Sequence, residues 1–334
     1  MRIWGELIIE TISNIIYHDL NIKEYLDSSN SCFLDIETTG LSRKYNMTYL
    51  IGVLSPIPDS NSWILKQYFA NSMDKEKDLL ERFIDDINVY DNIITYNGDS
   101  FDLPFINHRL DHYGIKSFVD PSKSFDLYRL IRQNKQYLSL PNLKLKTIEE
   151  SLGYFREDIY SGFDCIGFYH EYINSKNLEL KDNILKHNYD DLVHMLDIIK
   201  ILDVLDEKKS VTVEFKDFNR SFKIDDIYIL GDMINIIGSI DLALEQDISY
   251  YSSNYSIATE KLNNFKISME FKEGYISKEE KCVFIDLLDY PQLNLQDNID
   301  RNLPANIFVL IIEKQYCLQN IKDLLKALLK NVIL

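Results

Sequence analysis

Two acidic residues interrupt an apolar segment with strand character, FLDIETTGL at positions 33–41. Side chains at positions i and i+2 of a strand lie on one face, so Asp35 and Glu37 would lie side by side, with Leu34 and Ile36 on the opposite face. Like charges so close together repel, and their burial is costly unless a positive group holds them. The pair indicates a cation site, although DxE patterns also occur on solvated strand faces.

Two further acidic positions lie in YNGDSFDLPFI (96–106) and HNYDDLVHM (187–195). Asp102 would begin a helix after a strand and a turn, near the carboxyl edge of the sheet where α/β proteins place their chemistry. A helix cap or first-turn acid is the alternative for Asp102. His187 and Asp191 are four residues apart and share a helix face, as exposed ion pairs also do.

Four carboxylates from three elements could converge on a pair of hard cations. The four are Asp35, Glu37, Asp102 and Asp191. Oxygen ligands favour Mg²⁺ or Mn²⁺ over zinc. Two such ions stabilise both the attacking and the leaving oxygen of a phosphodiester. The sequence therefore predicts two divalent metal ions as cofactors.

The elements that would position these residues alternate between strands and helices. Strand patterns cover Cys32–Glu37, Thr48–Leu54, Ser62–Phe69 and Asn92–Tyr96, with a short one near Ser124. Helical patterns cover Asp74–Asn88, Phe101–Tyr113, Phe125–Gln133, Leu143–Leu152 and Lys181–Leu205. Three successive strands followed by alternating strands and helices predict an α/β fold, a mixed sheet flanked by helices.

These motifs, in this order, resemble those of a known superfamily. The chain is similar to the DnaQ-like 3′–5′ exonucleases of the DEDD type, which have the ribonuclease H-like fold. FLDIETTGL resembles the first exonuclease motif, YNGDSFDLPFI the second and HNYDDL the third. With TYLIGVL between the first two, the sequence more narrowly resembles the predicted ribonuclease H-like exonucleases called YprB-like. The resemblance covers about residues 30–203.

The resemblance implies a role for each matching residue. Asp35 would bridge both metals, and Glu37, Asp102 and Asp191 would complete the coordination shells. His187 would be the general base for the attacking water, a task that suits a group with a pKa near neutrality. The residues implied to line the substrate groove at the 3′ end are Thr38, Thr39, Leu41, Asn97 and Phe101.

The position of the histidine differs from that in the standard subclasses. In histidine-type members it stands five residues before the final aspartate, whereas His187 stands four before Asp191. Four is the position that a tyrosine takes in tyrosine-type members. Tyr189 is the second candidate for the base, but two residues from Asp191 it would point away from that helix face.

One basic segment could bind a nucleic-acid backbone despite the net charge of −17. Residues 123–146 contain six basic residues against Asp126 alone, with Tyr128 and Tyr137 interleaved. Basic residues beside stacking aromatics bind single strands without sequence readout. Arg129 and Arg132, three apart on one predicted helix, are the candidate contacts. A solvated helix face and loop explain the pattern equally well.

Composition and the remaining segments predict the organisation of the chain. Four cysteines without CxxC spacing and no run of 18 apolar residues predict a cytoplasmic protein that does not span a membrane. We expect an N-terminal helical segment at 1–30, a nuclease domain at 31–205 and a C-terminal α+β domain of unknown function at 210–334. The C-terminal region offers no chemistry and could bind a protein partner.

The leading hypothesis is a metal-dependent 3′–5′ exonuclease of single-stranded DNA or RNA. A binding or adaptor module on an inactive nuclease fold is one alternative, and a phosphodiesterase of short oligonucleotides is the other. The acidic surface suits short substrates better than long polymers. The residues do not distinguish DNA from RNA, because the 2′-hydroxyl contact depends on details of the groove.

Overall fold

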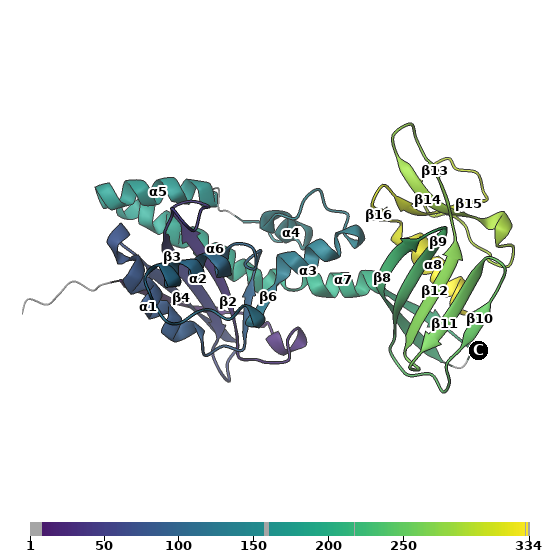
Figure 1. The fold of residues 1–334 in the computed structure, drawn as a ribbon, viewed down its shortest axis with the longest axis horizontal. Coiled ribbons are helices and arrows are strands. Elements are labelled where there is room, and N and C mark those ends of the chain that lie inside the picture. The colour runs from purple at the N-terminus through teal and green to yellow at the C-terminus, as the bar shows by residue number, and fades with distance from the viewer. Residues whose placement is uncertain (1–8, 157–159, 217, 331, 333–334) are drawn as a thin grey trace, which may run out of the picture. The chain divides into compact units, whose positions relative to one another are not determined.

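The computed structural model describes residues 9–156, 160–216, 218–330 and 332, which form two compact units (Figure 1). The described residues of 1–133 and 140–202 make up the first unit. The second unit contains the short segment 134–139 and the described residues from 203 onward. Helix α7 (Ile201–Lys209) leads from the first unit into the second.

A six-stranded mixed sheet forms the centre of the first unit. Its strands, in spatial order, are β1 (Glu10–Tyr17), β4 (Ser62–Phe69), β3 (Thr48–Pro56), β2 (Ser31–Thr38), β5 (Asn92–Thr95) and β6 (Ser124–Asp126). The first four strands pair antiparallel, whereas β2, β5 and β6 pair in parallel. The strand that contains Asp35 and Glu37 therefore lies where the sheet changes from antiparallel to parallel.

Helices cover this sheet on both faces. They are α1 (Glu76–Ile87), α2 (Asp102–His112), α3 (Leu127–Gln133), α4 (Leu145–Ser151), α5 (Gly162–Ser175) and α6 (Leu178–Ile198). Helix α1 contacts β3 and β4, while α5 and α6 contact β2. Alternate residues of β2 therefore meet different helices: Leu34 and Ile36 join the apolar core, and the two acids face α6.

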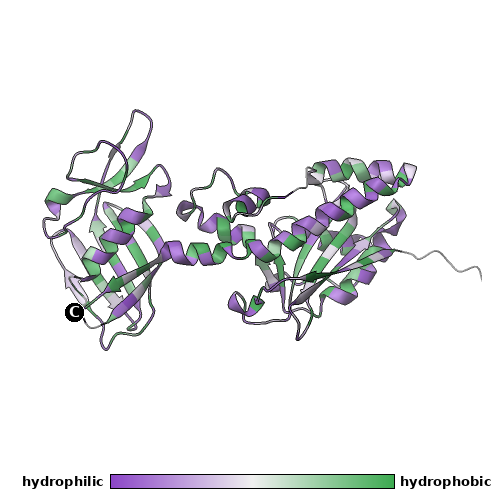
Figure 2. Ribbon diagram, turned by 180° about the vertical axis from the view of Figure 1, so that it is seen from behind, coloured by the Kyte–Doolittle hydropathy of each residue, from purple (hydrophilic) through white to green (hydrophobic). Residues whose placement is uncertain are grey.

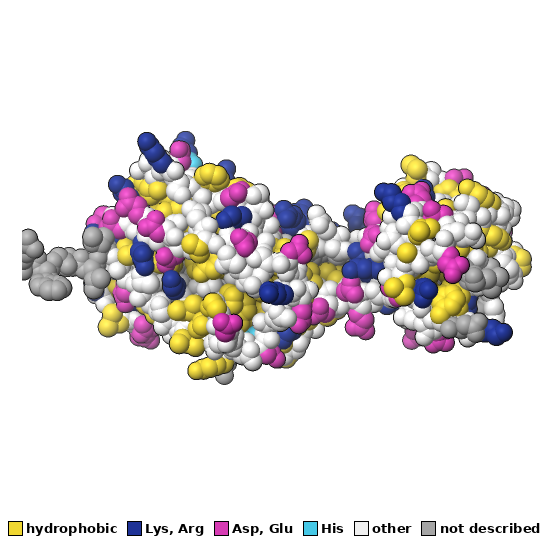
Figure 3. All heavy atoms as spheres, turned by 90° about the horizontal axis from the view of Figure 1, so that it is seen from below, with side chains coloured by type: hydrophobic (Ala, Val, Ile, Leu, Met, Phe, Trp, Pro, Cys, Tyr) yellow, Lys and Arg dark blue, Asp and Glu magenta, His cyan; other side chains and the backbone are white. Residues whose placement is uncertain are grey.

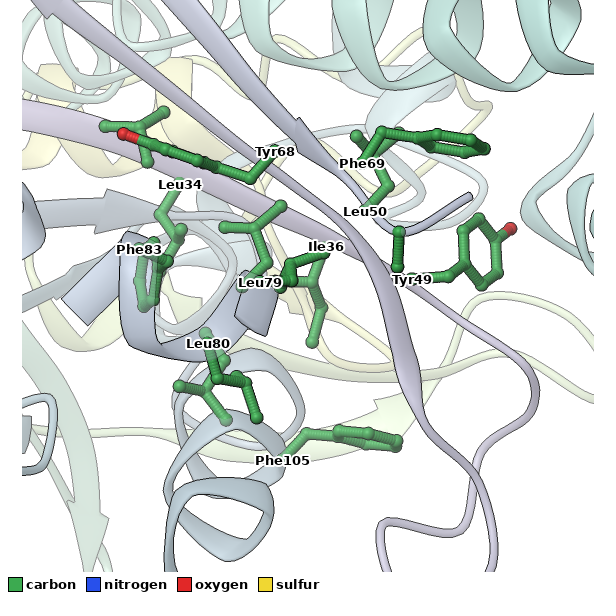
Figure 4. Packing of buried hydrophobic residues seen from close by; sticks show 14 of the residues in the cluster. Leu34, Ile36, Tyr49, Leu50, Tyr68, Phe69, Leu79, Leu80, Phe83 and Phe105 are labelled. Carbon is green, nitrogen blue, oxygen red and sulfur yellow. The ribbon is translucent and has the colours of Figure 1, made fainter. Parts of the chain in front are cut away.

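The apolar core of the first unit lies between β2 and the helix α1. Leu34 and Ile36 lie close to Leu79 and Phe83 of α1, and Phe105 of α2 completes the layer (Figure 4). All five side chains are buried. Burying each large apolar side chain contributes about 1.5–3 kcal/mol, so this packing fixes the position of β2 and of the acids on its other face.

The predicted fold class is confirmed: the first unit is a mixed sheet flanked by helices, with a further C-terminal β region. The expected N-terminal helix is wrong for the described residues, since Glu10–Tyr17 is an edge strand paired with β4. Its isoleucines and threonine favour a strand, and burial alternates along it. The predicted helix Lys181–Leu205 is two helices, α6 and α7. Helix α5 was not predicted.

The second unit consists mainly of antiparallel β-structure. One sheet contains β10 (Ser249–Tyr251), β11 (Tyr255–Glu260), β12 (Asn264–Glu270), β9 (Met233–Ile240), β8 (Asn219–Leu230) and β7 (Ser210–Glu214). The other contains β13 (Lys272–Tyr275), β14 (Lys281–Asp286), β15 (Ile307–Ile312) and β16 (Gln315–Tyr316). The strand patterns of the sequence correspond to β7, β8, β12, β14 and β15; they lie at Val211–Phe215, Phe222–Leu230, Phe265–Phe271, Val283–Leu287 and Ile307–Glu313. The patterns missed β9, β10, β11, β13 and β16.

Helix α8 (Leu318–Lys330) packs against β7 and β15 in this unit. Its apolar residues Ile321, Leu324, Leu325 and Leu328 are fully buried, as their helical spacing predicts. The two-sided character of this helix is visible as alternating green and purple in Figure 2. Across the described part of the chain, every helix is too short or too polar to cross a bilayer.

Candidate metal and nucleic-acid site

The acids of β2 project from the face of the sheet that α6 covers. Asp35 pairs with Gly52 of β3 and Glu37 pairs with Leu50, and a register shift follows directly after Glu37. Glu37 is 6% exposed and Asp35 is half-buried. The central strand thus holds two carboxylates, two residues apart, in a largely dehydrated position.

An amide network orients Asp35. Asn188 of α6 donates from Nδ2 to Asp35 Oδ2 at 2.7 Å, and its own Oδ1 accepts from Gln67 Nε2 at 2.9 Å. Gln67 also donates to the Leu185 carbonyl oxygen at 2.8 Å. The network needs a glycine at position 52, because a β-carbon there would lie 2.3 Å from Asn188 Oδ1. The amide groups fix the orientation of Asp35 without neutralising its charge.

Asp102 is the first residue of α2 and lies close to the backbone of β2. Its Oδ1 accepts from the Ile36 backbone N–H at 3.2 Å. The preceding turn is set by Asn97, which has φ 71°, and by Asp126, whose carboxylate accepts from the Asn97 N–H at 2.9 Å. Asp99 does not cap α2; its side chain pairs with Arg129.

His187 and Asp191 lie on one face of α6 and turn toward β2. The His187 Nε2 atom is 3.8 Å from Glu37 Oε1 and 3.9 Å from Asp191 Oδ2. Arg156 forms an ion pair with Asp191 and also binds Glu149, from Nε to Oε2 at 2.5 Å. One guanidinium therefore serves two carboxylates here.

These side chains meet in one pocket of about 670 Å³. The pocket is lined by all five residues given metal or base roles: Asp35, Glu37, Asp102, His187 and Asp191. It is also lined by every residue expected in the substrate groove: Thr38, Thr39, Leu41, Asn97 and Phe101. Tyr189 is not among the lining residues. Residues separated by more than 150 positions in the sequence thus share one concave surface.

The two basic candidates lie elsewhere. Arg129 and Arg132 are both exposed on α3 and do not line the pocket. Arg129 is 52% exposed and pairs with Asp99. On the face in Figure 3, basic and acidic side chains are interspersed. Tyr137 is buried against Tyr316 in the second unit, so its ring is not available to stack on a base.

The carboxylates of the site are buried and close together, so the charge of each one disfavours ionisation of the others. Burial, followed by the charges of Asp191 and Asp102, raises the pKa of Asp35 well above its usual range. Burial and the charge of Asp35 do the same to the pKa of Glu37. Burial raises the pKa of Asp102 to about 7, although the hydrogen bond from Ile36 acts in the opposite direction.

This donor set fits hard divalent cations. Three carboxylates of the site are buried or half-buried and have raised pKa values. A cation bound between them would stabilise their ionised forms, because it would offset both their mutual repulsion and their desolvation penalty. Oxygen atoms are the preferred ligands of Mg²⁺ and Mn²⁺. Asp35, Glu37, Asp102 and Asp191 are the residues that could hold such ions.

Several neighbours of the site were missed in the sequence. Helix α5 contributes Gly162, Phe163 and Ile166 to the pocket. A capping box forms the N-terminus of this helix. The Ser161 hydroxyl accepts a hydrogen bond from the Asp164 N–H, and the Asp164 carboxylate accepts one from the Ser161 N–H. The Ser-x-x-Asp spacing was a usable signal. Arg156 had no comparable local signal, because its partners Glu149 and Asp191 are brought to it by folding.

A comparison with known protein families matches the region that contains the site. A family model described as the RNase_H superfamily matches residues 32–203. DNA polymerase 1 of Sulfurisphaera ohwakuensis is 28% identical over 169 residues, which is 49% of this chain and 17% of the polymerase. A DNA polymerase of Pyrococcus glycovorans is 30% identical over 116 residues, covering 28% of this chain and 15% of that protein. The chain thus spans less than a fifth of these relatives.

Two solved structures overlap with larger parts of the chain. The family B DNA polymerase of Pyrobaculum calidifontis is 15% identical, with a TM-score of 0.40, over 52% of this chain and 24% of that one. Exonuclease I of E. coli in complex with an oligonucleotide is 11% identical, with a TM-score of 0.31, over 62% of this chain and 54% of that one. The family match covers slightly more than half of the sequence, from Cys32 to Asp203. The chain therefore belongs to the RNase_H superfamily.

Proposed function

We propose that the protein is a metal-dependent 3′–5′ exonuclease that hydrolyses single-stranded DNA or RNA. The observation that carries the proposal is the convergence of Asp35, Glu37, Asp102 and Asp191 with His187 in one pocket. The family match spans all five residues. The narrower resemblance to YprB-like exonucleases belongs to the same proposal.

Each residue has a role consistent with its position. Asp35, Glu37, Asp102 and Asp191 would hold two Mg²⁺ or Mn²⁺ ions, which would supply positive charge to stabilise the scissile phosphate. His187 accepts the proton of the attacking water at Nε2, the ring atom near Glu37. Asn188 orients Asp35 through its hydrogen bond.

The rim of the pocket offers contacts for a terminal nucleotide. Leu41 is 84% exposed and Phe163 is 82% exposed, although both line the pocket. Exposed apolar side chains at a pocket rim suit contact with the faces of bases. Thr38 and Thr39 follow Glu37 in the chain, are buried and also line the pocket. A base held at this rim would bring its phosphate toward Asp35.

The test is degradation of 5′-labelled single-stranded DNA and RNA of equal sequence in Mg²⁺, Mn²⁺ or EDTA. We expect a ladder that shortens from the 3′ end, depends on metal and falls at least about a thousandfold in Asp35→Asn, on the order of 4 kcal/mol. Asp190→Asn is the matched control: Asp190 is on the same helix as Asp191 but pairs with Lys186 at 2.7 Å. Full activity of Asp35→Asn would overturn the metal assignment.

A phosphodiesterase of short oligonucleotides is the second candidate. The net charge of −17 favours it, since a polyanion is repelled more strongly than a dinucleotide. Comparing turnover of a dinucleotide with that of a thirty-mer of the same sequence separates the two. Binding of either substrate without turnover in both metals would identify a nucleic-acid-binding module instead.

A further inference from the structure

A thiol lies beside the carboxylates and has no part in the chemistry proposed above. Cys165 is in the first turns of α5 and is fully buried. One carboxylate oxygen of Glu37, the Cys165 sulfur and one ring nitrogen of His187 all lie within 4.8 Å of one another. These three residues come from β2, α5 and α6, three separate elements that the fold packs together.

This donor set differs from the oxygen-only set in its chemistry. Thiolate, imidazole and carboxylate together suit zinc and similar borderline or soft cations, whereas Mg²⁺ avoids sulfur and nitrogen. Zn²⁺ holds sulfur at about 2.3 Å and nitrogen or oxygen at about 2.0–2.2 Å, which places tetrahedral ligand atoms roughly 3.3–3.8 Å apart. The His187 Nε2 to Glu37 Oε1 distance of 3.8 Å is already near this range.

A buried tyrosine lies beside the same residues and helps to fix their position. The Tyr49 side chain is fully buried, and its hydroxyl lies beside Glu37, where a hydrogen bond from Tyr49 favours the ionised carboxylate. Its ring stacks on Tyr169 of α5 at 3.9 Å between centroids, which fixes its position. After burial, the neighbouring Glu37 and Cys165 contribute most to raising the pKa of Tyr49. The hydroxyl can therefore donate to Glu37, one of the three side chains of the cluster.

The pocket gives direct access to two of the three donor residues. Glu37 and His187 line the pocket, and so do Gly162 and Ile166, which flank Cys165 on α5. Gly162 lies close to His187, since a β-carbon there would be 3.9 Å from Nε2. The N-terminal end of α5 also favours a negative sulfur through its helix dipole. A cation that enters the pocket thus meets Glu37 and His187 directly, and the buried Cys165 sulfur lies within 4.8 Å of both donor atoms.

We propose that Glu37, Cys165 and His187 form a second metal site that binds Zn²⁺, or Co²⁺ in its place, with the fourth position open to the pocket. Binding releases the Cys165 thiol proton to solvent. The site overlaps the Mg²⁺ site at Glu37 and removes His187 as a base. We further infer that Zn²⁺ inhibits hydrolysis by occupying this site, an inference that rests on the proposed function.

Cobalt spectroscopy tests the site without any use of nuclease activity. We expect the full chain titrated with Co²⁺ to show an intense visible spectrum typical of four-coordination and a near-ultraviolet thiolate-to-cobalt charge-transfer band. An excess of Mg²⁺ should leave the band in place. Cys165→Ser should abolish the charge-transfer band, whereas Cys32→Ser, which changes another fully buried cysteine of the first unit, should retain it. Thermal unfolding of both variants checks that they fold.

Absence of the band from the unmodified protein, or its persistence in Cys165→Ser, overturns the proposed site. A separate measurement tests the inhibition, by adding Zn²⁺ to the Mg²⁺-dependent reaction. The half-inhibitory Zn²⁺ concentration should rise at least about tenfold in Cys165→Ser relative to Cys32→Ser. Equal inhibition of the two variants overturns the inhibitory role but not the site. Failure of the exonuclease proposal would appear only as absence of hydrolysis, which leaves the cobalt result unaffected.

Discussion

The first unit contains two groups of buried carboxylates with opposite electrostatic environments. Glu76 on α1 is fully buried, and Arg109 of α2 binds it from Nε at 2.8 Å and from Nη2 at 2.5 Å. Tyr113 and the Thr48 N–H complete its hydrogen bonds. In the pocket, by contrast, Asp35 is held by an amide and Asp102 by a backbone N–H, neither of which carries charge.

The difference separates a structural acid from one suited to bind an external cation. The protein supplies Glu76 with its own counter-ion, so nothing further is needed there. In the pocket, one guanidinium is shared between Asp191 and Glu149 while three other acids keep raised pKa values. A buried excess of negative charge lowers the stability of the fold. Such groups with strongly shifted pKa values are concentrated at functional sites.

The strongest test of this comparison removes the internal counter-ion. We expect Arg109→Met to lower the free energy of unfolding by about 3–5 kcal/mol, because it leaves Glu76 charged, buried and unpaired. Asp35→Asn, which removes one of several repelling charges, should leave stability in EDTA unchanged or raise it. Urea denaturation of the full chain measures both effects.

The control for Arg109→Met is a solvent-exposed ion pair on α1, the helix that carries Glu76. Lys77 and Glu81 of α1 are each about half exposed and lie 3.6 Å apart. Lys77→Met should change stability by no more than about 1 kcal/mol. If Arg109→Met is equally mild, the pair is not the main stabilising contact of Glu76 and the comparison fails.

The next test addresses the network that orients Asp35. Gly52→Ala would place a methyl group 2.3 Å from Asn188 Oδ1 and from Leu192 Cδ1. We expect a loss of about 1–3 kcal/mol in stability from overpacking. Displacement of Asn188 should also weaken Mg²⁺ binding about tenfold, which is typical of residues that orient a ligand.

Gly167→Ala is the matched glycine substitution. Gly167 is on α5 with no heavy atom within 4 Å of the added β-carbon, so helix propensity alone should act. A gain of up to about 1 kcal/mol is expected there. Wild-type Mg²⁺ affinity in Gly52→Ala would mean that the amide network does not orient Asp35. Isothermal titration calorimetry of each variant provides the affinity.

A smaller effect should appear in the pH dependence of stability. Asp102 has a pKa of about 7 in the folded chain, against about 4 for an unfolded aspartate. Because the folded state binds the proton more tightly, its stabilising contribution is complete below pH 4 and is lost as the pH rises through 7. The metal-free Tm should therefore fall by several degrees between pH 5 and pH 8.

Two comparisons isolate the contribution of the carboxylates to that slope. Asp102→Asn should show a shallower fall in Tm over the same range, because the titrating group is gone. Addition of Mg²⁺ at pH 8 should raise the Tm of the wild type, since the ion binds only the folded arrangement of acids. A steeper fall in Asp102→Asn than in the wild type would contradict the assignment of the raised pKa.

The smallest effects are expected for substitutions of the exposed arginines of α3. Arg129 and Arg132 should differ in their contribution to nucleic-acid binding, because Arg129 already has an ion-pair partner. Arg129 already pairs with Asp99, so Arg129→Ala should change the affinity for single strands by no more than about threefold. Arg132→Ala on the same helix should weaken binding more and reduce the slope of log K against log salt by about 1. Fluorescence anisotropy at several salt concentrations measures both. A larger loss in Arg129→Ala would show that its pair with Asp99 opens to bind nucleic acid.

The sequence by itself determined the candidate acids, since a period of two on a strand and of four on a helix places Asp35 with Glu37 and His187 with Asp191. It also indicated the alternating elements of the first unit and the buried stripe of α8. Those signals are local, because each depends on residues within one or two turns or strand repeats. The edge strand β1 was misread because short apolar segments fit both periods.

Only the tertiary structure decided which charges are compensated and what else lies beside the acids. The counter-ion of Glu76 is 33 residues away and the amide that holds Asp35 is 153 residues away, so no local pattern could pair them. The same holds for Cys165, whose sulfur meets Glu37 and His187 only because α5 packs against both β2 and α6. The burial of an acid and the presence of a counter-ion both depend on contacts between distant segments of the chain. Those contacts decide whether a buried acid is neutralised within the fold, as Glu76 is, or is left to bind a metal ion.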